Sequence, residues 1–158
     1  MTKIERSIVI GRPVEEVWEF VHDIANDRLW QTTLVESEQL TEGPMRVGTS
    51  VREVRHFLGL RVELAWEVTA FEPHTRSGIK GISGPVPLSG GYLLEPVDAG
   101  TRFTVSGELD AHGLFKLAEP VFARITSREL EANLGHLKDL LEAESATAQE
   151  GAALSDRR

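Results

Sequence analysis

The sequence predicts an α+β fold in which a curved, seven-stranded antiparallel sheet wraps around a long C-terminal helix, with two short helices after the first strand. Residues 60–70 alternate strictly between apolar side chains and a second, largely polar set, which is typical of an antiparallel strand with one buried face. Residues 114–143 are instead helical in composition and apolar period. Because such a sheet exposes one face and must cover the other, we expect the helix to cover it.

The first strand and the two short helices occupy the N-terminal 30 residues. Residues 3–10 are rich in β-branched side chains and predict a strand. Pro13 suits the first turn of a helix, and the apolar residues that follow have helical spacing over about two turns. Asp23 is placed to cap a second short helix over residues 24–29.

The middle of the chain predicts a meander of short strands joined by hairpins. Besides residues 60–70, strands are expected near residues 33–41, 48–57, 74–82, 87–97 and 101–109. The segments between them carry turn residues such as Leu58-Gly59 and Ser83-Gly84-Pro85. Connections this short imply antiparallel neighbours, so the strands should follow one another in the sheet.

The C-terminal helix has apolar residues in two separate stripes. One contains Leu117, Val121 and Ile125, and the other contains Leu130, Leu134, Leu137 and Leu141. Since each residue turns a helix by about 100°, Val121 and Leu130 point about 180° apart. The two halves should therefore bury opposite sides, or the helix should bend near Pro120. We expect a domain over residues 1–144 and a disordered tail over residues 145–158.

Composition excludes several classes of function. A chain of 158 residues fits one domain. The formal net charge of −8 opposes binding to nucleic acids or anionic membranes. Cysteine is absent, which excludes disulfides and thiolate chemistry. The sequence has no visible signal peptide and no apolar run of about 20 residues, so we expect a cytoplasmic protein without a membrane span.

Motifs for metals and cofactors are also missing. The histidines have neither HxxxH nor HxH spacing, and GxSxG and P-loop motifs are absent. Gly78, Gly81 and Gly84 match GxxGxxG, but they fall in predicted strands and a hairpin, where glycine permits curvature. We therefore expect no metal and no cofactor.

A series of short strings along the chain resembles one known superfamily. They are PVEEVW at 13–18, RLW at 28–30, VGT at 47–49, VTAFEP at 68–73, LEPV at 94–97, GTR at 100–102 and LGHLKDLLE at 134–142. Over residues 3–143 this order is similar to the START-like (SRPBCC) superfamily, in particular its polyketide cyclase/dehydrase-like branch. The resemblance implies a helix-grip fold with a cavity between sheet and long helix, often holding an apolar or aromatic small molecule. Members include cyclases, lipid carriers, hormone receptors and chaperone cofactors, so the fold alone leaves the function open.

The predicted hairpin at Leu58-Gly59 determines which side chains of residues 48–57 face the cavity. With a two-residue turn, Glu53 opposes Leu64 and Arg55 opposes Val62, so the charged pair faces inward among apolar residues. A register shifted by one residue would turn Arg52 and His56 inward instead. A solvated rim or a bulged strand is a further interpretation, and the usual exposure of Arg and Glu favours it.

The cavity should be lined mainly by apolar residues with few polar groups. We expect it to be formed by Trp30, Val51, Leu64, Trp66, Ile79, Tyr92, Leu94, Phe103, Val105, Leu117 and Val121. Tyr92 is the neutral polar group best suited to orient a ligand, although it could equally be a core tyrosine whose hydroxyl is hydrogen-bonded.

Three functions are compatible with this reading. The first is the binding of an apolar or aromatic, lipid- or polyketide-like molecule. The second is a cyclase or dehydratase, with Tyr92 or Glu53 moving protons and Arg55 polarising a carbonyl. The third is a homodimerisation module that uses the stripe over 117–125. Because no strong catalytic constellation is visible, the sequence favours binding, with a cyclase as the alternative.

Overall fold

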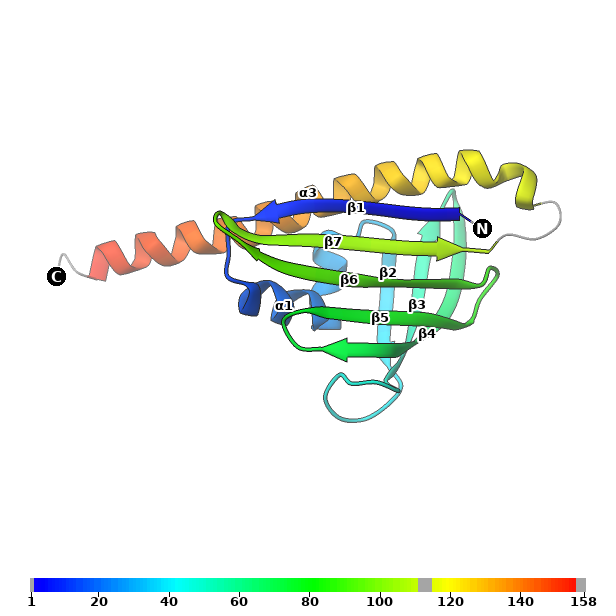
Figure 1. Ribbon diagram of the computed structural model, residues 1–158, viewed down its shortest axis with the longest axis horizontal. Coiled ribbons are helices and arrows are strands. Elements are labelled where there is room, and N and C mark those ends of the chain that lie inside the picture. Colours follow the sequence, from blue (N-terminus) through cyan, green and yellow to red (C-terminus); the bar gives the residue numbers. More distant parts are fainter. Residues whose placement is uncertain (1, 111–114, 156–158) are drawn as a thin grey trace.

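The computed structural model describes the chain over residues 2–110 and 115–155, with side chains described over 2–110 and 116–143 (Figure 1). In chain order the elements are β1 (Thr2–Ile10), α1 (Val14–His22), the 3-10 helix η1 (Ile24–Asn26), α2 (Asp27–Trp30), β2 (Leu34–Gln39), β3 (Ser50–Phe57), β4 (Leu60–Glu72), β5 (Arg76–Ser83), β6 (Leu88–Val97), β7 (Gly100–Leu109) and α3 (Phe115–Ser155). No helix in the described ranges is long and apolar enough to cross a membrane.

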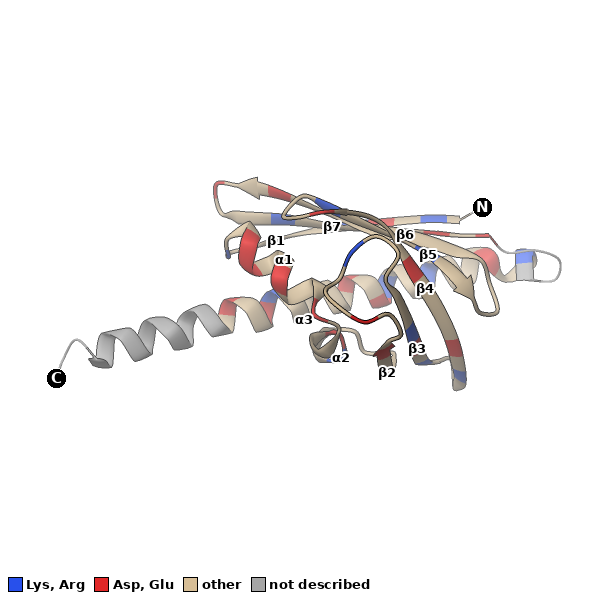
Figure 2. Ribbon diagram, turned by 90° about the horizontal axis from the view of Figure 1, so that it is seen from below, with Lys and Arg blue, Asp and Glu red and all other residues tan. Residues whose placement is uncertain are grey.

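All seven strands form one antiparallel sheet in the order β1-β7-β6-β5-β4-β3-β2. Strands β2 to β7 follow one another as a meander, and β1 joins the far edge beside β7. Figures 1 and 2 show the sheet curving over α1, α2 and α3, with α3 running along β1. The predicted sheet around a C-terminal helix is therefore confirmed, and so are the two short helices after the first strand.

The second predicted helix consists of η1 followed by α2. Asp23 caps it, because Asp23 Oδ1 accepts a hydrogen bond from the backbone N–H of Ala25 at 3.0 Å. Both η1 and α2 are short, and α2 contacts α3. This contact places α2 beside the space between the sheet and the long helix.

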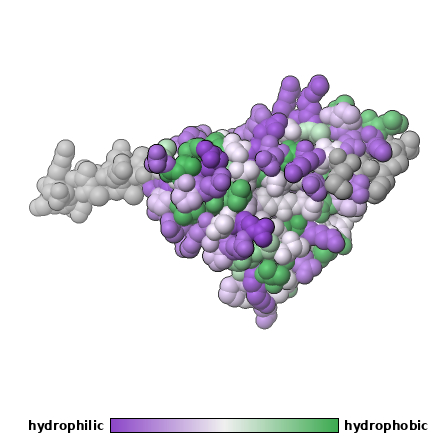
Figure 3. Space-filling view, viewed as in Figure 1, coloured by the Kyte–Doolittle hydropathy of each residue, from purple (hydrophilic) through white to green (hydrophobic). Residues whose placement is uncertain are grey.

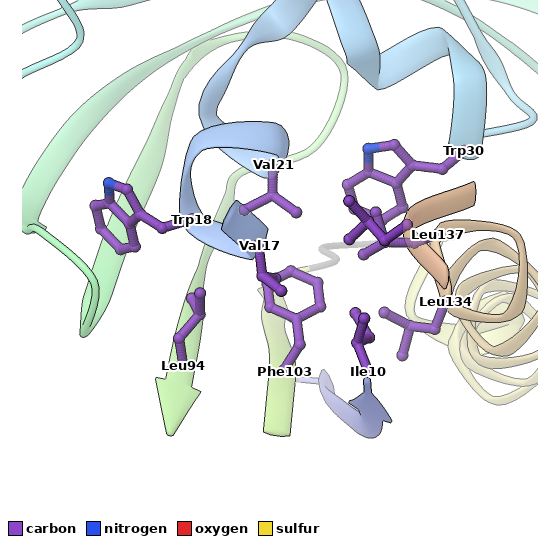
Figure 4. Close-up of a cluster of buried hydrophobic side chains, with 10 residues drawn as sticks. Ile10, Val17, Trp18, Val21, Trp30, Leu94, Phe103, Leu134 and Leu137 are labelled. Atoms are coloured by element: carbon purple, nitrogen blue, oxygen red, sulfur yellow. The ribbon is translucent and has the colours of Figure 1, made fainter. Parts of the chain in front are cut away.

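The main hydrophobic core lies where α1 and α2 meet the second half of α3 and strands β1, β6 and β7. Its buried members include Val17, Phe103 and Leu137, and Figure 4 shows them pointing toward one another. The core residues come from the ends of β1 and β6, the start of β7 and the second half of α3, so the core fills one end of the space under the sheet.

The outer face of the molecule seen in Figure 3 carries mostly hydrophilic residues with scattered apolar ones.

The second half of α3 closes this core, as expected. Leu134, Leu137 and Leu141 are buried. Hydrogen bonds fix this half to the end of β1: the Lys138 ammonium donates to the Val9 carbonyl at 2.8 Å, and the Gly11 N–H donates to Glu142 Oε1 at 3.0 Å. The helix runs to Ser155, past the predicted end at 143. The division into a domain over 1–144 and a tail over 145–158 stays a prediction.

The first half of α3 differs from the prediction. Leu117 and Val121 are 83% and 63% exposed, so they neither close the core nor border the interior. Phe122 and Thr126 face the interior instead, in line with Leu130 further along the helix. Because 122, 126 and 130 are four residues apart, one helix face looks toward the sheet throughout. The inward face contains polar residues, which is why the apolar stripes alone suggested two opposite faces.

The hairpin between β3 and β4 has the predicted register. Phe57 pairs with Leu60, Arg55 with Val62 and Glu53 with Leu64. The turn residues Leu58 and Gly59 both have positive φ, 50° and 78°, as a two-residue type I′ hairpin requires. The inward orientation of Glu53 and Arg55 follows directly from this turn.

Candidate functional site

A cavity of about 460 Å³ lies between the concave face of the sheet, the short helices and the first half of α3. Its walls come from β3 to β7, α1, α2 and α3, and most of the lining side chains are apolar. This volume falls within the range of roughly 300–1,000 Å³ that is typical of small-molecule sites. The arrangement provides a mostly apolar space, with a buried carboxyl group from α2 and an ion pair from β3 among its polar groups.

The structure brings together many of the residues predicted for the cavity. Six predicted apolar or aromatic residues line it, together with Glu53 and Arg55. The six are Trp30, Leu64, Trp66, Ile79, Tyr92 and Val105. Whether they contact a ligand stays a prediction.

Five other predicted residues lie elsewhere. Val51 packs in a small cluster with Trp66 and Val68, while Leu94 and Phe103 belong to the main core. Val51, Leu94 and Phe103 lie on the expected face of their strands, but neighbouring side chains cover them almost completely. Leu117 and Val121 are on the solvent side of α3. The homodimer expected from their stripe stays a prediction.

Glu53 and Arg55 form an ion pair inside the cavity. Arg55 Nε donates to Glu53 Oε2 at 2.9 Å, and the Glu53 side chain is only 5% exposed. Arg55 also donates through Nη1 to Thr33 Oγ1 at 3.1 Å and through Nη2 to Gln31 Oε1 at 2.7 Å. The interpretations as a solvated rim or a shifted register are therefore wrong, because three acceptors hold the guanidinium in place.

The Arg55 guanidinium remains charged despite its location. Burial is the largest single effect and disfavours the charged form, but the charge and the hydrogen bond of Glu53, together with the charges of Tyr92 and Glu129, raise the pKa of Arg55 above its usual value. A fixed cation paired with a buried anion gives the site a strong local dipole without a net charge.

Tyr92 stands on β6 in the middle of an aromatic group. Its ring centroid lies 5.0 Å from that of Phe103, 5.6 Å from His22 and 6.4 Å from Trp30. Burial, followed by the negative charges of Asp27 and Glu53, raises the pKa of Tyr92 above its ordinary value, while a side-chain hydrogen bond with Gln31 acts in the opposite direction. The phenol therefore keeps its proton and can act as a neutral hydrogen-bonding group.

Asp27 is a cavity residue that the sequence analysis missed. It is 5% exposed. Burial raises its pKa to about 8, and repulsion by Glu53 adds to the shift, whereas Arg55 opposes it. At neutral pH the carboxyl group is therefore protonated. A signal was available, because Asp27 precedes the buried Trp30 by three residues and so shares its face of α2.

His22 and Ser77 form a second polar contact on the cavity wall. His22 Nδ1 lies 2.8 Å from the Trp18 carbonyl oxygen, and Nε2 lies 2.7 Å from Ser77 Oγ. Because a carbonyl can only accept, Nδ1 carries the proton. Burial lowers the pKa of His22, so the ring is neutral and Nε2 accepts from the serine hydroxyl. No sequence motif marked this pair.

The site can therefore hold an apolar molecule and orient its oxygen atoms. It offers a neutral acid, a phenol and a paired guanidinium along one side. In the described ranges, no three His, Cys, Asp or Glu residues are grouped closely enough to hold a metal ion. The expected absence of a metal and a cofactor stays a prediction.

Solved structures with the same fold include two aromatase/cyclases. A protein from Thermus thermophilus superimposes with a TM-score of 0.79 at 18% identity, over 91% of this chain and 99% of that one. The Zhui aromatase/cyclase of a Streptomyces species gives 0.75 at 18% identity, over 89% and 93%. The di-domain aromatase/cyclase BexL gives 0.72 at 22% identity, over 90% of this chain and 47% of that one. At these identities the similarity establishes the fold. No curated protein matches the sequence.

A family model matches almost all of the chain. The model, described as polyketide cyclase/dehydrase and lipid transport, aligns with residues 1–142. These residues include every strand, both short helices and the core-forming half of α3. The protein thus belongs to the polyketide cyclase/dehydrase and lipid transport family.

Proposed function

We propose that the protein binds an apolar or aromatic small molecule, lipid- or polyketide-like, in the cavity between the sheet and α3. The observation that carries this proposal is the cavity itself, whose walls are mostly apolar and carry a smaller number of polar groups. An apolar ligand would gain roughly 25 cal/mol for each Å² of its surface removed from water. The family description, which names lipid transport besides cyclase and dehydrase activities, supports the same class of ligand.

The proposal can be tested by filling the cavity. Gly107 lines it, and a β-carbon built there would meet only the Ser89 carbonyl oxygen at 3.9 Å. Gly107→Leu should therefore fold and occupy ligand space. Thr104→Leu, three residues earlier on the opposite face of β7, adds an apolar side chain outside the cavity and is the matched control.

Binding is measured by native mass spectrometry after gentle purification, and by thermal shift with a panel of naphthalene derivatives and lipids. We expect a retained compound or a ligand-dependent rise in Tm for the natural chain and for Thr104→Leu, and its loss in Gly107→Leu. A chain that retains nothing and responds to no compound contradicts the proposal. Equal binding by both variants contradicts the location.

A cyclase or dehydratase is the second candidate, and the network around Arg55 favours it. Arg55 would polarise a substrate carbonyl, while Tyr92 or Glu53 would move a proton, and the cavity walls would fold a flexible chain into a reactive shape. Two of the solved structures with this fold carry the name aromatase/cyclase. In this reading Asp27, which holds its proton at neutral pH, is a further acid beside the same space.

The two candidates differ in one measurement. Incubation with a synthetic poly-β-ketone, followed by mass spectrometry, detects loss of water or a cyclised product. An enzyme should lose turnover in Tyr92→Phe and Glu53→Gln while Thr104→Leu keeps it. Turnover that is unchanged in both variants would remove their proposed roles, and binding without any turnover would leave the carrier function.

A further inference from the structure

We infer that Asp27 and Trp30 form a hydrogen-bonding subsite for a hydroxyl group of the ligand, so that the natural ligand is an uncharged, hydroxyl-bearing apolar molecule rather than an anion. The inference rests on the proposed binding function and specifies which chemical class the cavity takes. Both residues belong to α2 and line the cavity.

The first observation is unused hydrogen-bonding capacity. Four buried side-chain polar atoms in the described part of the chain lack a hydrogen-bond partner, and three of them belong to cavity-lining residues. The three are Asp27 Oδ1, Trp30 Nε1 and Thr126 Oγ1. Buried polar atoms in folded proteins almost always have a partner, so each exception marks a place where a ligand could supply one.

The second observation is that several other polar groups of the cavity already have hydrogen-bond partners. The guanidinium of Arg55 is held by Glu53, Thr33 and Gln31. His22 and Ser77 bond to each other. Asn133 Oδ1 accepts from the backbone N–H and the hydroxyl of Thr32, each at 3.2 Å. Two of the three unpartnered atoms of the cavity lie on α2.

The two atoms on α2 lie on one face of the helix. Asp27 and Trp30 are three residues apart and are 5% and 2% exposed. The indole N–H is close enough to oppose the rise in the pKa of Asp27 slightly, but the pair does not reach hydrogen-bond geometry. Figure 4 shows the carbon rings of Trp30 over Leu137 and Leu134, with the nitrogen pointing away from them.

A hydroxyl group matches this pair chemically. The indole N–H can only donate, so it requires an acceptor. Asp27 Oδ1 can accept a hydrogen bond. One hydroxyl satisfies both, because its oxygen accepts from Trp30 and its hydrogen is donated to Asp27.

The surrounding charges disfavour an anionic ligand. The charged and titratable groups that act on Asp27 are Glu53, Arg55 and Asp23, and Tyr92 responds in turn to Asp27. The single cation among them, Arg55, is already paired with Glu53 at 2.9 Å. A ligand carboxylate would therefore enter next to Glu53 without a free cation to pair with, at a substantial cost in desolvation.

The test uses three probes of nearly equal shape: 2-naphthol, 2-methylnaphthalene and 2-naphthoate. Their dissociation constants are measured on the full chain by titration calorimetry. Since one net hydrogen bond contributes about 0.5–1.5 kcal/mol, naphthol should bind roughly 3- to 10-fold tighter than methylnaphthalene. Naphthoate should bind more weakly than both.

Variants then locate the subsite. Asp27→Leu keeps the branched shape of the side chain without its polar oxygens, and Trp30→Phe keeps an aromatic ring; each should reduce the naphthol preference while methylnaphthalene binding stays within about two-fold. Thr126→Val removes the third unpartnered oxygen, on α3, and should leave the preference intact. If Trp30→Phe does not fold, Asp27→Leu and the comparison of probes on the natural chain still decide.

The outcomes separate the inference from the proposed function. Equal affinity for naphthol and methylnaphthalene, or a preference for naphthoate, overturns the subsite but leaves an apolar binding protein. Loss of the preference only in Thr126→Val moves the contact to α3 and also overturns it. Failure of all three probes to bind, including to the Thr104→Leu control, contradicts the proposed function itself.

Discussion

Arg55 Nε lies 2.9 Å from Glu53 Oε2, and both side chains extend from β3 into an otherwise largely apolar cavity. Because the side chains of Glu53 and Arg55 are only 5% and 25% exposed, each charge depends on the other to offset its loss of hydration. A second ion pair joins β3 to β4 on the outer face of the sheet, where Arg52 Nε lies 2.7 Å from Glu63 Oε1. The inner pair is more buried than the outer pair, so we expect it to contribute more to the free energy of unfolding.

Breaking the inner pair should destabilise the protein strongly. Glu53→Gln leaves the guanidinium without its counter-charge, and the expected cost is about 3–5 kcal/mol in the free energy of unfolding. The double variant Glu53→Gln, Arg55→Met should lose less than the sum of the two single variants. Urea denaturation measures all three. Glu63→Gln on the exposed pair is the control and should cost far less, because solvent screens that interaction; equal losses at both pairs would contradict this account.

Replacing the carboxyl group of Asp27 should stabilise the protein near neutral pH. Its pKa is about 8 in the folded chain against 3.8 in the unfolded chain. The folded state therefore binds more protons than the unfolded state between these values, so stability falls as pH rises from about 4 to about 8. Asp27→Asn lacks this penalty and should be more stable at pH 7 by about 2–4 kcal/mol, with little difference near pH 4.

Thermal unfolding at a series of pH values measures this effect. Asp139→Asn, on the exposed side of α3, is the control. A parallel shift of the stability of Asp27→Asn at every pH would show that its carboxyl group does not titrate between the two values.

His22 should act in the opposite direction at acid pH. Burial lowers its pKa below 6.5, so the unfolded chain takes up a proton that the folded chain refuses. Stability due to this residue is complete above about pH 6.5 and is lost as the pH falls toward its folded pKa. His22→Gln should flatten that acid slope relative to the natural chain, whereas His136→Gln on the helix surface should not. An unchanged slope in His22→Gln would mean that the imidazole is not desolvated.

Two leucines on α3 test which face of the helix is buried. Leu137 is 0% exposed, so Leu137→Ala should cost about 2–5 kcal/mol. Leu117 is on the solvent side, and Leu117→Ala should change the free energy of unfolding by less than about 0.5 kcal/mol. Chemical denaturation compares them in the same helix; a large loss from Leu117→Ala would indicate that this stripe is covered.

The sequence predicted the sheet and offered the inward direction of the charged pair as one interpretation, although the usual exposure of Arg and Glu favoured a solvated rim or a bulged strand. The alternation over residues 60–70 and a turn that accepts positive φ at Gly59 determine the register, and the register determines which side of β3 faces inward. These are local signals, carried by neighbouring residues. General statistics on the exposure of Arg and Glu pointed the other way, because they ignore the pairing that makes burial tolerable.

The polar half of the site could not be derived in the same way. Asp27 is buried because α2 packs against α3, and Thr126 faces inward because it shares a helix face with Phe122 and Leu130. Both facts depend on contacts between segments about 100 residues apart. Which part of an apolar strand face remains open also depends on such contacts, and for that reason Leu94 and Phe103 were expected in the cavity but belong to the core.

The turn at Leu58 and Gly59 has a consequence for how this site could evolve. Neither residue lines the cavity. The number of residues in the turn nevertheless determines which side chains of β3 face inward. One residue inserted or deleted there would withdraw the buried acid and its arginine together and present the side chains of Arg52 and His56 in their place. A single codon in a turn that does not itself line the cavity could thus exchange the whole set of ionisable groups on this strand. Related chains with the same fold can differ in chemistry through the length of a hairpin, without any substitution among the residues that touch the ligand.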